Sequence, residues 1–220
     1  MDTWRCWGNA VVKLFVEGGG EGKVLRTECR QGLSEFLKKA GLTGCLPRIV
    51  ASGSKGQAYD DFRTAVRSGE PALLLVDSEG PVLTECQTGE PETWRPWAHL
   101  AQRAGDGWAM PVGATDRHCH LMVECMESWF LADRATLAAF FDPGFRPTAL
   151  PAATRAIESI EKVQLFDALR AATKDCKTKS QYGKGEHSFK LLASIDPSKV
   201  LAASPWAKRF VDETKRQMGC

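Results

Sequence analysis

The chain has 220 residues, of which 43% are hydrophobic and 25% are charged, a composition typical of a globular protein with a full core and not of a disordered one. No apolar run reaches the ~20 residues that span a bilayer. The start, MDTWRCWGN, lacks the basic region and apolar core of a signal peptide, so we expect a cytoplasmic protein without membrane attachment. The net charge of +2 hides an asymmetry, because residues 162–220 hold 12 Lys and Arg against 6 Asp and Glu. Such a basic segment indicates a phosphate-binding appendage, although a solvated helical surface has the same composition.

Two βα units are predicted at the start of the chain. Residues 11–16, VVKLFV, are β-branched and aromatic, and the run stops at Glu17 before three glycines, as a short buried strand does. Apolar residues at helical spacing then predict an amphipathic helix from Lys23 to Ala40. PRIVA, residues 47–51, predicts a second strand, and the helical pattern returns over residues 58–66.

A third strand is predicted at residues 72–76, where every side chain is apolar. Such a run suits a central parallel strand that is buried on both faces. Alternating strands and helices with short connections predict a parallel sheet flanked by helices, and ligands of such sheets lie beyond the carboxyl ends of the strands. Glu17, Asp77 and Glu79 each follow an apolar run and are expected at that edge.

The rest of the chain is predicted as a loop, one more strand and helices. Residues 84–117 are rich in Gly, Pro and Trp and predict a long loop with one helical turn near residues 98–104. A strand at residues 120–123 and a helix at residues 124–141 follow. We therefore expect an α/β core over residues 1–141, and a basic, helical extension over residues 142–220 that packs on this core.

The cysteines are expected to be reduced thiols, because disulfide frameworks belong to small exported proteins and nothing in the sequence signals export. The nearest approach to a zinc site is His118, Cys119, His120 and Cys125, whose spacing matches no usual zinc pattern. An alternating strand with thiols in the core is the simpler interpretation.

The glycine-rich loop after the first strand is not a nucleotide-binding loop. A Walker motif needs Ser or Thr after its Gly-Lys pair, but Gly22 and Lys23 are followed by Val24, and the first position of the motif is occupied by Glu17. The informative residue is therefore the carboxylate. Glu17, Asp77 and Glu79 would repel one another unless a hard cation neutralised them, and Mg²⁺ or Mn²⁺ is the natural candidate.

The glycines have a separate use in this interpretation. They let backbone amides approach a substrate phosphate, and the helix that begins at Lys23 directs its positive end to the same place. The predicted phosphate-binding residues of this loop are Gly18, Gly19, Gly20, Gly22 and Lys23.

The motifs FVEGGGEG and LLLVDSEG resemble those of the Toprim domain, the metal-dependent core of topoisomerases, DnaG-type primases and nucleases of the overcoming-lysogenization-defect type. The resemblance covers roughly residues 10–135. It implies a Toprim-like, Rossmann-like sheet in which Glu17 binds metal or handles a proton, while Asp77 and Glu79 bind metal. The second acid of the usual DxD pattern is Glu79 in this sequence, and a glutamate side chain reaches one methylene further than aspartate.

Longer runs, among them HLMVECMESWFLAD and YGKGEHSFKLLASIDP, are similar to a bacterial family of unassigned function that is often encoded beside AAA-type ATPases. By analogy with Toprim proteins of phage-defence pairs, this implies a nuclease effector governed by an ATPase and acting on DNA or RNA.

Further site residues are expected outside the core motifs. Glu124 and Glu127 are predicted on one helical face, where they could bind a second metal ion or simply favour the helix dipole, and Glu127 is preferred because it lies in the family-like MESWFLAD segment. Lys184 and Lys190 could hold a phosphate or complete the acidic site, although lysine-rich loops are often only solvated. His187 could be a base, but an isolated histidine is more often structural.

The sequence thus predicts a Mg²⁺- or Mn²⁺-dependent nuclease of Toprim type. The alternative is a non-catalytic Toprim-like subunit that binds a partner ATPase or a nucleotide, and the glutamate at position 79 is the feature that favours it.

Overall fold

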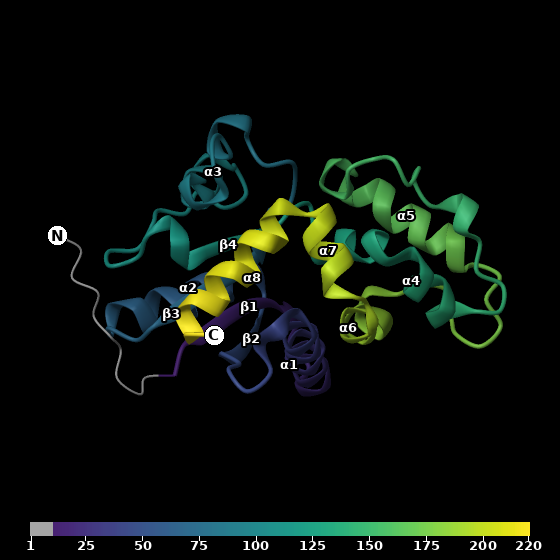
Figure 1. Ribbon diagram of the computed structural model, residues 1–220, viewed down its shortest axis with the longest axis horizontal. Coiled ribbons are helices and arrows are strands. Elements are labelled where there is room, and N and C mark those ends of the chain that lie inside the picture. The colour runs from purple at the N-terminus through teal and green to yellow at the C-terminus, as the bar shows by residue number, and fades with distance from the viewer. Residues whose placement is uncertain (1–10) are drawn as a thin grey trace.

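A four-stranded parallel sheet lies at the centre of the computed structural model, which describes residues 11–220 (Figure 1). The strand order is β2-β1-β3-β4. The strands are β1 (Lys13–Gly19), β2 (Arg48–Gly53), β3 (Ala72–Asp77) and β4 (Cys119–Met122). β3 is buried along its whole length, as its continuous apolar run predicts. The sheet confirms the predicted α/β class and is consistent with a Rossmann-like or Toprim-like arrangement.

Helices surround this sheet and make up the C-terminal part of the described chain (Figure 1). The α-helices are α1 (Lys23–Leu37), α2 (Lys55–Arg67), α3 (Pro96–Gln102), α4 (Arg134–Phe141), α5 (Lys162–Thr173), α6 (Lys184–Ser194), α7 (Pro197–Ala203) and α8 (Pro205–Met218). Short 3-10 turns cover Thr84–Cys86, Pro91–Thr93, Asp116–His118, Met126–Asp133, Pro147–Ala149 and Ile157–Ser159, and a π-helical turn covers Lys38–Leu42. Within residues 11–220 no helix is long and apolar enough to cross a bilayer.

Alternate side chains of the sheet enter two separate cores. Leu14 and Leu75 point into the core that contains α1, whereas Phe15 and Leu74 point into the core that contains α2. This alternation is the period of a β-strand, and it places one helix on each face of the sheet. Cys119 and Cys125 belong to opposite cores, and for this reason they cannot share a metal ion.

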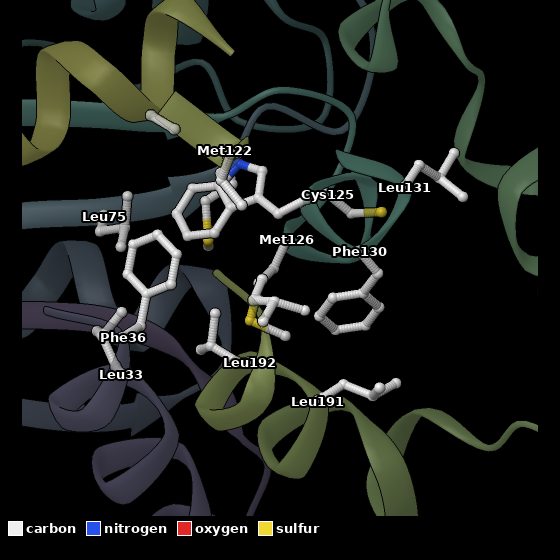
Figure 2. Close-up of a cluster of buried hydrophobic side chains, with 14 of the residues drawn as sticks. Leu33, Phe36, Leu75, Met122, Cys125, Met126, Phe130, Leu131, Leu191 and Leu192 are labelled. Carbon is white, nitrogen blue, oxygen red and sulfur yellow. The ribbon is translucent and has the colours of Figure 1, made fainter. Parts of the chain in front are cut away.

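The C-terminal helices complete the core on the α1 side. Figure 2 shows Leu33 and Phe36 of α1 on the same side of the cluster as the sheet residue Leu75, while Leu191 of α6 lies below Phe130 and Leu192 lies between these two groups. α6 runs against α1, and α8 packs against β4. The helices after residue 141 are therefore part of the same hydrophobic cluster as the sheet.

The structure changes three sequence-based expectations. The helix expected over residues 124–141 is divided: a 3-10 segment over Met126–Asp133 precedes α4, and Asp133 caps α4 by accepting a hydrogen bond from the backbone N–H of Thr136 at 3.4 Å. Glu124 lies outside both segments with φ +63°, so it does not share a helical face with Glu127. The first helix also ends early, because Gly41 takes φ +101° in the turn that follows.

The third change concerns the cysteines. Cys45 and Cys220 form a disulfide, contrary to the expectation of reduced thiols throughout. Cys29, Cys86, Cys119 and Cys125 are buried free thiols, as expected for core positions. Cys6 and the rest of the MDTWRCWGN start lie outside the described residues.

Candidate metal centre

Three carboxylates converge at the carboxyl edge of the sheet. Glu17, Asp77 and Glu79 each offer an oxygen, and these oxygens all lie within 4.8 Å of one another. Glu17 stands in the last part of β1, Asp77 ends β3, and Glu79 follows two residues later. β1 and β3 are neighbours in the sheet, so residues sixty positions apart in the sequence meet at one edge.

A bulge in β1 presents Glu17 to this edge. The β1–β2 register is regular up to Val16, after which Glu17, Gly18 and Gly19 all stand opposite Gly53. A bulge next to a site re-aims side chains that a regular strand would direct away from it. The carboxylate of Glu17 consequently reaches β3 and accepts a hydrogen bond from the backbone N–H of Asp77 at 3.2 Å.

Asp77 is the most deeply buried member of the triad, with 2% of its surface exposed. Its Oδ1 accepts a hydrogen bond from the backbone N–H of Met126 at 3.0 Å. Burial and the nearby charges of Glu17 and Glu127 raise the pKa of Asp77 to about 8. Burial also raises the pKa of Glu17, against the effect of its bond from the Asp77 N–H. Buried carboxylates remain ionised only when positively charged groups lie beside them.

Two left-handed turns fix the residues around Asp77. Glu79 has φ +58° and Glu124 has φ +63°, a region that non-glycine residues enter only at a cost of about 1–3 kcal/mol. The turns are joined, because the backbone N–H of Glu79 donates to the backbone oxygen of Glu124 at 3.2 Å and the N–H of Glu124 donates to Ser78 Oγ at 2.8 Å. Strained backbone held by such a network is characteristic of functional sites.

Glu127 is completely buried and contributes a fourth carboxylate. Its Oε1 accepts a hydrogen bond from Ser188 Oγ at 2.9 Å, and Ser188 in turn lies 2.8 Å from the hydroxyl of Tyr182. Because the Ser188 proton is directed to Glu127, Tyr182 is the donor to Ser188. Oε2 of Glu127 is buried and has no hydrogen-bond partner among the described residues. An unsatisfied buried carboxylate oxygen is rare and offers an acceptor for a water molecule or a cation.

The two lysines predicted from the C-terminal region have different positions. Lys184 Nζ lies 3.9 Å from Asp77 Oδ2 and 3.9 Å from Glu127 Oε1. Lys190 pairs instead with Glu28 at 3.7 Å and does not line the pocket beside the carboxylates. Six residues of a helix correspond to about 9 Å of rise and a different face, so α6 directs only Lys184 to the centre.

Lys162 is a residue of this centre that sequence reasoning missed. Its Nζ donates to Glu79 Oε2 at 2.6 Å and lies 3.6 Å from Asp77 Oδ2. Although burial opposes it, the hydrogen bond with Glu79 and the charge of Asp77 raise the pKa of Lys162. No motif surrounds Lys162; the only signal in the sequence is that the basic part of the chain begins there.

The glycine-rich loop lines a pocket of about 340 Å³ beside the carboxylates. Its lining residues are Glu17, Gly18, Gly19, Gly20, Leu25, Gly53, Asp77, Met122, Met126, Glu127, Lys184, Gly185 and Phe189. Gly19 has φ +84°, and a Cβ atom there would lie 2.6 Å from the Cα of Arg26, so only glycine fits. Gly22 precedes the first residue of α1, Lys23, and neither residue lines the pocket.

A larger hollow of about 470 Å³ lies between α8 and residues 90–92. Charged side chains of both signs dominate its lining, and none of the four carboxylates of the centre contributes to it. The smaller pocket is the candidate site because it brings buried carboxylates, a lysine and the glycine-rich loop together.

Comparison with known proteins places this centre within a family. No curated protein and no solved structure matches the chain. A family described as a domain of unknown function (DUF4276) matches residues 16–214, a range that includes every carboxylate and lysine of the centre. The chain therefore belongs to the DUF4276 family.

Proposed function

We propose that the protein is a Mg²⁺- or Mn²⁺-dependent phosphodiesterase of Toprim type that cleaves nucleic acid. The observation that carries the proposal is the convergence of Glu17, Asp77 and Glu79 oxygens within 4.8 Å, at the edge of a parallel sheet where ligands bind. Binding of a phosphate next to them is supported by the Lys184 ammonium and the glycine-rich loop, which line the same pocket.

The donor set fits a hard divalent cation. All of its side-chain ligands are carboxylates, which Mg²⁺ and Mn²⁺ prefer, and the unpartnered Oε2 of Glu127 supplies a further acceptor in the pocket. A bound cation would neutralise the carboxylates and lower the pKa of a bound water molecule, which generates a nucleophile at neutral pH.

The protein's own residues supply the remaining functions of the proposed reaction. Lys184 and the backbone N–H groups of Gly19 and Gly20 bind the phosphate and stabilise its negative charge. Glu17 lines the pocket beside the other carboxylates, where it either binds the metal or accepts a proton. Leu25 and Phe189 form an apolar wall that limits the access of water.

Substitution of the two central carboxylates tests this proposal. Glu17→Gln and Asp77→Asn keep the shape of the side chains but remove the charge, and each is expected to lower Mn²⁺-dependent cleavage of DNA or RNA at least ~100-fold. The matched control is Glu21→Gln, which changes an exposed acid of the same loop that does not line the pocket. Undiminished cleavage by both variants, with circular dichroism showing an intact fold, would refute the proposal.

A non-catalytic subunit is the second candidate, and one observation favours it. Lys162 and Lys184 already place positive charge beside Asp77, so the centre is partly neutralised by the protein itself. Such a protein would use the same surface to bind a partner ATPase or a nucleotide. Calorimetric titration separates the two candidates: absence of Mn²⁺ binding at millimolar concentration favours the non-catalytic subunit.

We further propose that an AAA-type ATPase controls the activity in anti-phage defence. The support is the similarity of the MESWFLAD and YGKGEHSFK segments to a family often encoded beside such ATPases. The proposal predicts that an adjacent gene encodes an AAA-type ATPase, and that co-expression of the two proteins, followed by gel filtration, yields a joint complex. Separate elution of the two proteins, with and without ATP, would contradict the proposal.

A further inference from the structure

A lysine is held between the carboxylates of the candidate centre. Lys162 is the first residue of α5, and its backbone N–H donates to Glu124 Oε2 at 3.0 Å. Its Nζ lies 2.6 Å from Glu79 Oε2 and 3.6 Å from Asp77 Oδ2. Its side chain is only 28% exposed. Lys162 is thus fixed at its backbone and at its ammonium group, unlike a solvated surface lysine.

The charges of the centre fit one divalent cation. Asp77 and the charged groups next to it are four carboxylates and two ammonium groups: Glu17, Asp77, Glu79, Glu127, Lys162 and Lys184. In their ordinary charged forms, four negative and two positive groups leave a net charge of −2, which one divalent ion balances. A second divalent ion would leave an excess of +2 in a partly buried place, where like charges interact strongly.

The positions of these groups also restrict the space for a second ion. Asp77 Oδ1 accepts the Met126 N–H at 3.0 Å, while Asp77 Oδ2 lies 3.6 Å from Lys162 and 3.9 Å from Lys184. Asp77 Oδ2 therefore already faces two ammonium groups. Glu127 Oε1 accepts a hydrogen bond from Ser188. A second cation bound to Asp77 would have to displace these ammonium groups.

We propose that the centre takes one divalent cation and that Lys162 supplies the second positive charge beside Glu79 and Asp77. The inference rests on the proposed function, because it requires that the acidic triad holds a cation. It gives a reason for glutamate at position 79: on its left-handed turn, the carboxylate of Glu79 meets Lys162 as well as the other two acids of the triad. The Lys162 ammonium then offsets the negative charge of Glu79 and Asp77, which a second ion would otherwise have to do.

The stoichiometry of Mn²⁺ binding tests the inference. Isothermal titration of the full-length protein should give one Mn²⁺ per chain. Lys162→Met removes the ammonium but keeps the length of the side chain, so this variant should bind its first Mn²⁺ at least about tenfold more tightly and accept a second Mn²⁺ at millimolar concentration. Lys190→Met is the matched control, because Lys190 pairs with Glu28 outside the pocket, and it should titrate like the wild type.

Two kinds of result would overturn the inference, and they have different meanings. If the wild type binds two Mn²⁺ ions, or if Lys162→Met has the wild-type stoichiometry and affinity, the role of Lys162 is refuted while the metal-dependent function stands. If the wild type binds no Mn²⁺, both proposals fall together. Thermal unfolding confirms that each variant is folded, and Lys162→Gln replaces Lys162→Met if the latter is not.

Discussion

The orientation of a single carboxylate, that of Glu127, depends on two hydroxyl groups. Tyr182 donates to Ser188, and Ser188 donates to Glu127 Oε1 at 2.9 Å, all three being buried. Charge-assisted hydrogen bonds of this kind are stronger than neutral ones and fix the direction of the acceptor. The chain of hydroxyls thus keeps Oε2 of Glu127 directed away from Ser188.

Removal of the Ser188 hydroxyl should be costly. Ser188→Ala leaves a buried carboxylate oxygen without its donor, so we expect the free energy of unfolding to fall by about 2 kcal/mol in urea titration. Ser128 is an internal control, because its Oγ is also buried but has no hydrogen-bond partner among the described residues. Ser128→Ala should therefore be close to neutral. Equal effects of the two substitutions would show that the Ser188 bond does not stabilise the protein.

The residues of the centre differ in how far the sequence predicts them. Glu17 and Asp77 were predictable because each ends an apolar run, and the ends of parallel strands meet at one edge. Lys162 was not, because its approach to Glu79 depends on how α5 packs and on the left-handed turn at Glu79, neither of which has a local signal. Lys184 and Lys190 looked equivalent in the sequence, and only the placement of α6 separates them.

At the scale of the elements, the contact between α1 and α6 decides where Lys184 lies. A Cβ atom on Gly32 would lie 2.5 Å from the backbone oxygen of Phe189, so α1 and α6 approach each other at this glycine. Phe189 also borders the pocket. A shift of α6 away from α1 would move Lys184, the first residue of α6, away from Asp77 and Glu127.

Gly32→Ala is therefore expected to destabilise the protein. Alanine favours a helix over glycine by about 1 kcal/mol, but here the new methyl group meets backbone atoms that must move, so we expect a net loss of about 1–3 kcal/mol. Gly56→Ala in α2 is the matched control, since its Cβ would meet no atom within 4 Å. That substitution should be neutral or stabilising in the same urea titration. A stabilising effect of Gly32→Ala would contradict close packing of the two helices.

The strands were more predictable than the segment before α4. β1 and β3 follow from continuous apolar runs, which tertiary contacts reinforce. The sequence of residues 124–141 reads as one helix, but the left-handed turn at Glu124 and the cap at Asp133 divide it. The turn at Glu124 is held by a hydrogen bond to the distant Ser78, whereas the cap at Asp133 is a local bond from Thr136. Helical periodicity reports neither of them.

At the scale of the whole molecule, Asp133 joins the segment before α4 to the C-terminal helices. Lys199 Nζ donates to its Oδ1 at 2.6 Å, and the backbone N–H of Asp196 donates to its Oδ2 at 3.0 Å. Burial alone would raise the pKa of Asp133, but these hydrogen bonds lower it to about 2. The folded state therefore holds the ionised carboxylate more firmly than the unfolded state does.

This shift predicts part of the acid sensitivity of the protein. Because the folded pKa is depressed below the unfolded value of about 3.9, the contribution of Asp133 to stability is present above pH ~4 and is lost as the pH falls toward 2. Asp133→Asn should cost about 2 kcal/mol at pH 7, and the difference from the wild type should shrink toward pH 2. Asp167→Asn, which removes an exposed ion pair with Arg170, should cost under about 0.5 kcal/mol at every pH. A penalty for Asp133→Asn that does not change with pH would refute the assignment.

The acidic residues of the centre precede its lysines in the sequence, and this order matters while the protein is being synthesised. Three of the carboxylates come from β1 and the end of β3, whereas Lys162 and Lys184 come from α5 and α6, which share a hydrophobic core with α1 and one face of the sheet. During synthesis the ribosome delivers the acidic residues first and the lysines late. On the proposed function, a nascent chain cannot act on the messenger being translated or on nearby DNA, since its catalytic centre is assembled only when α6 has emerged and docked. If the proposed function is correct, the order of the elements along the chain delays the activity until α6 has folded against α1.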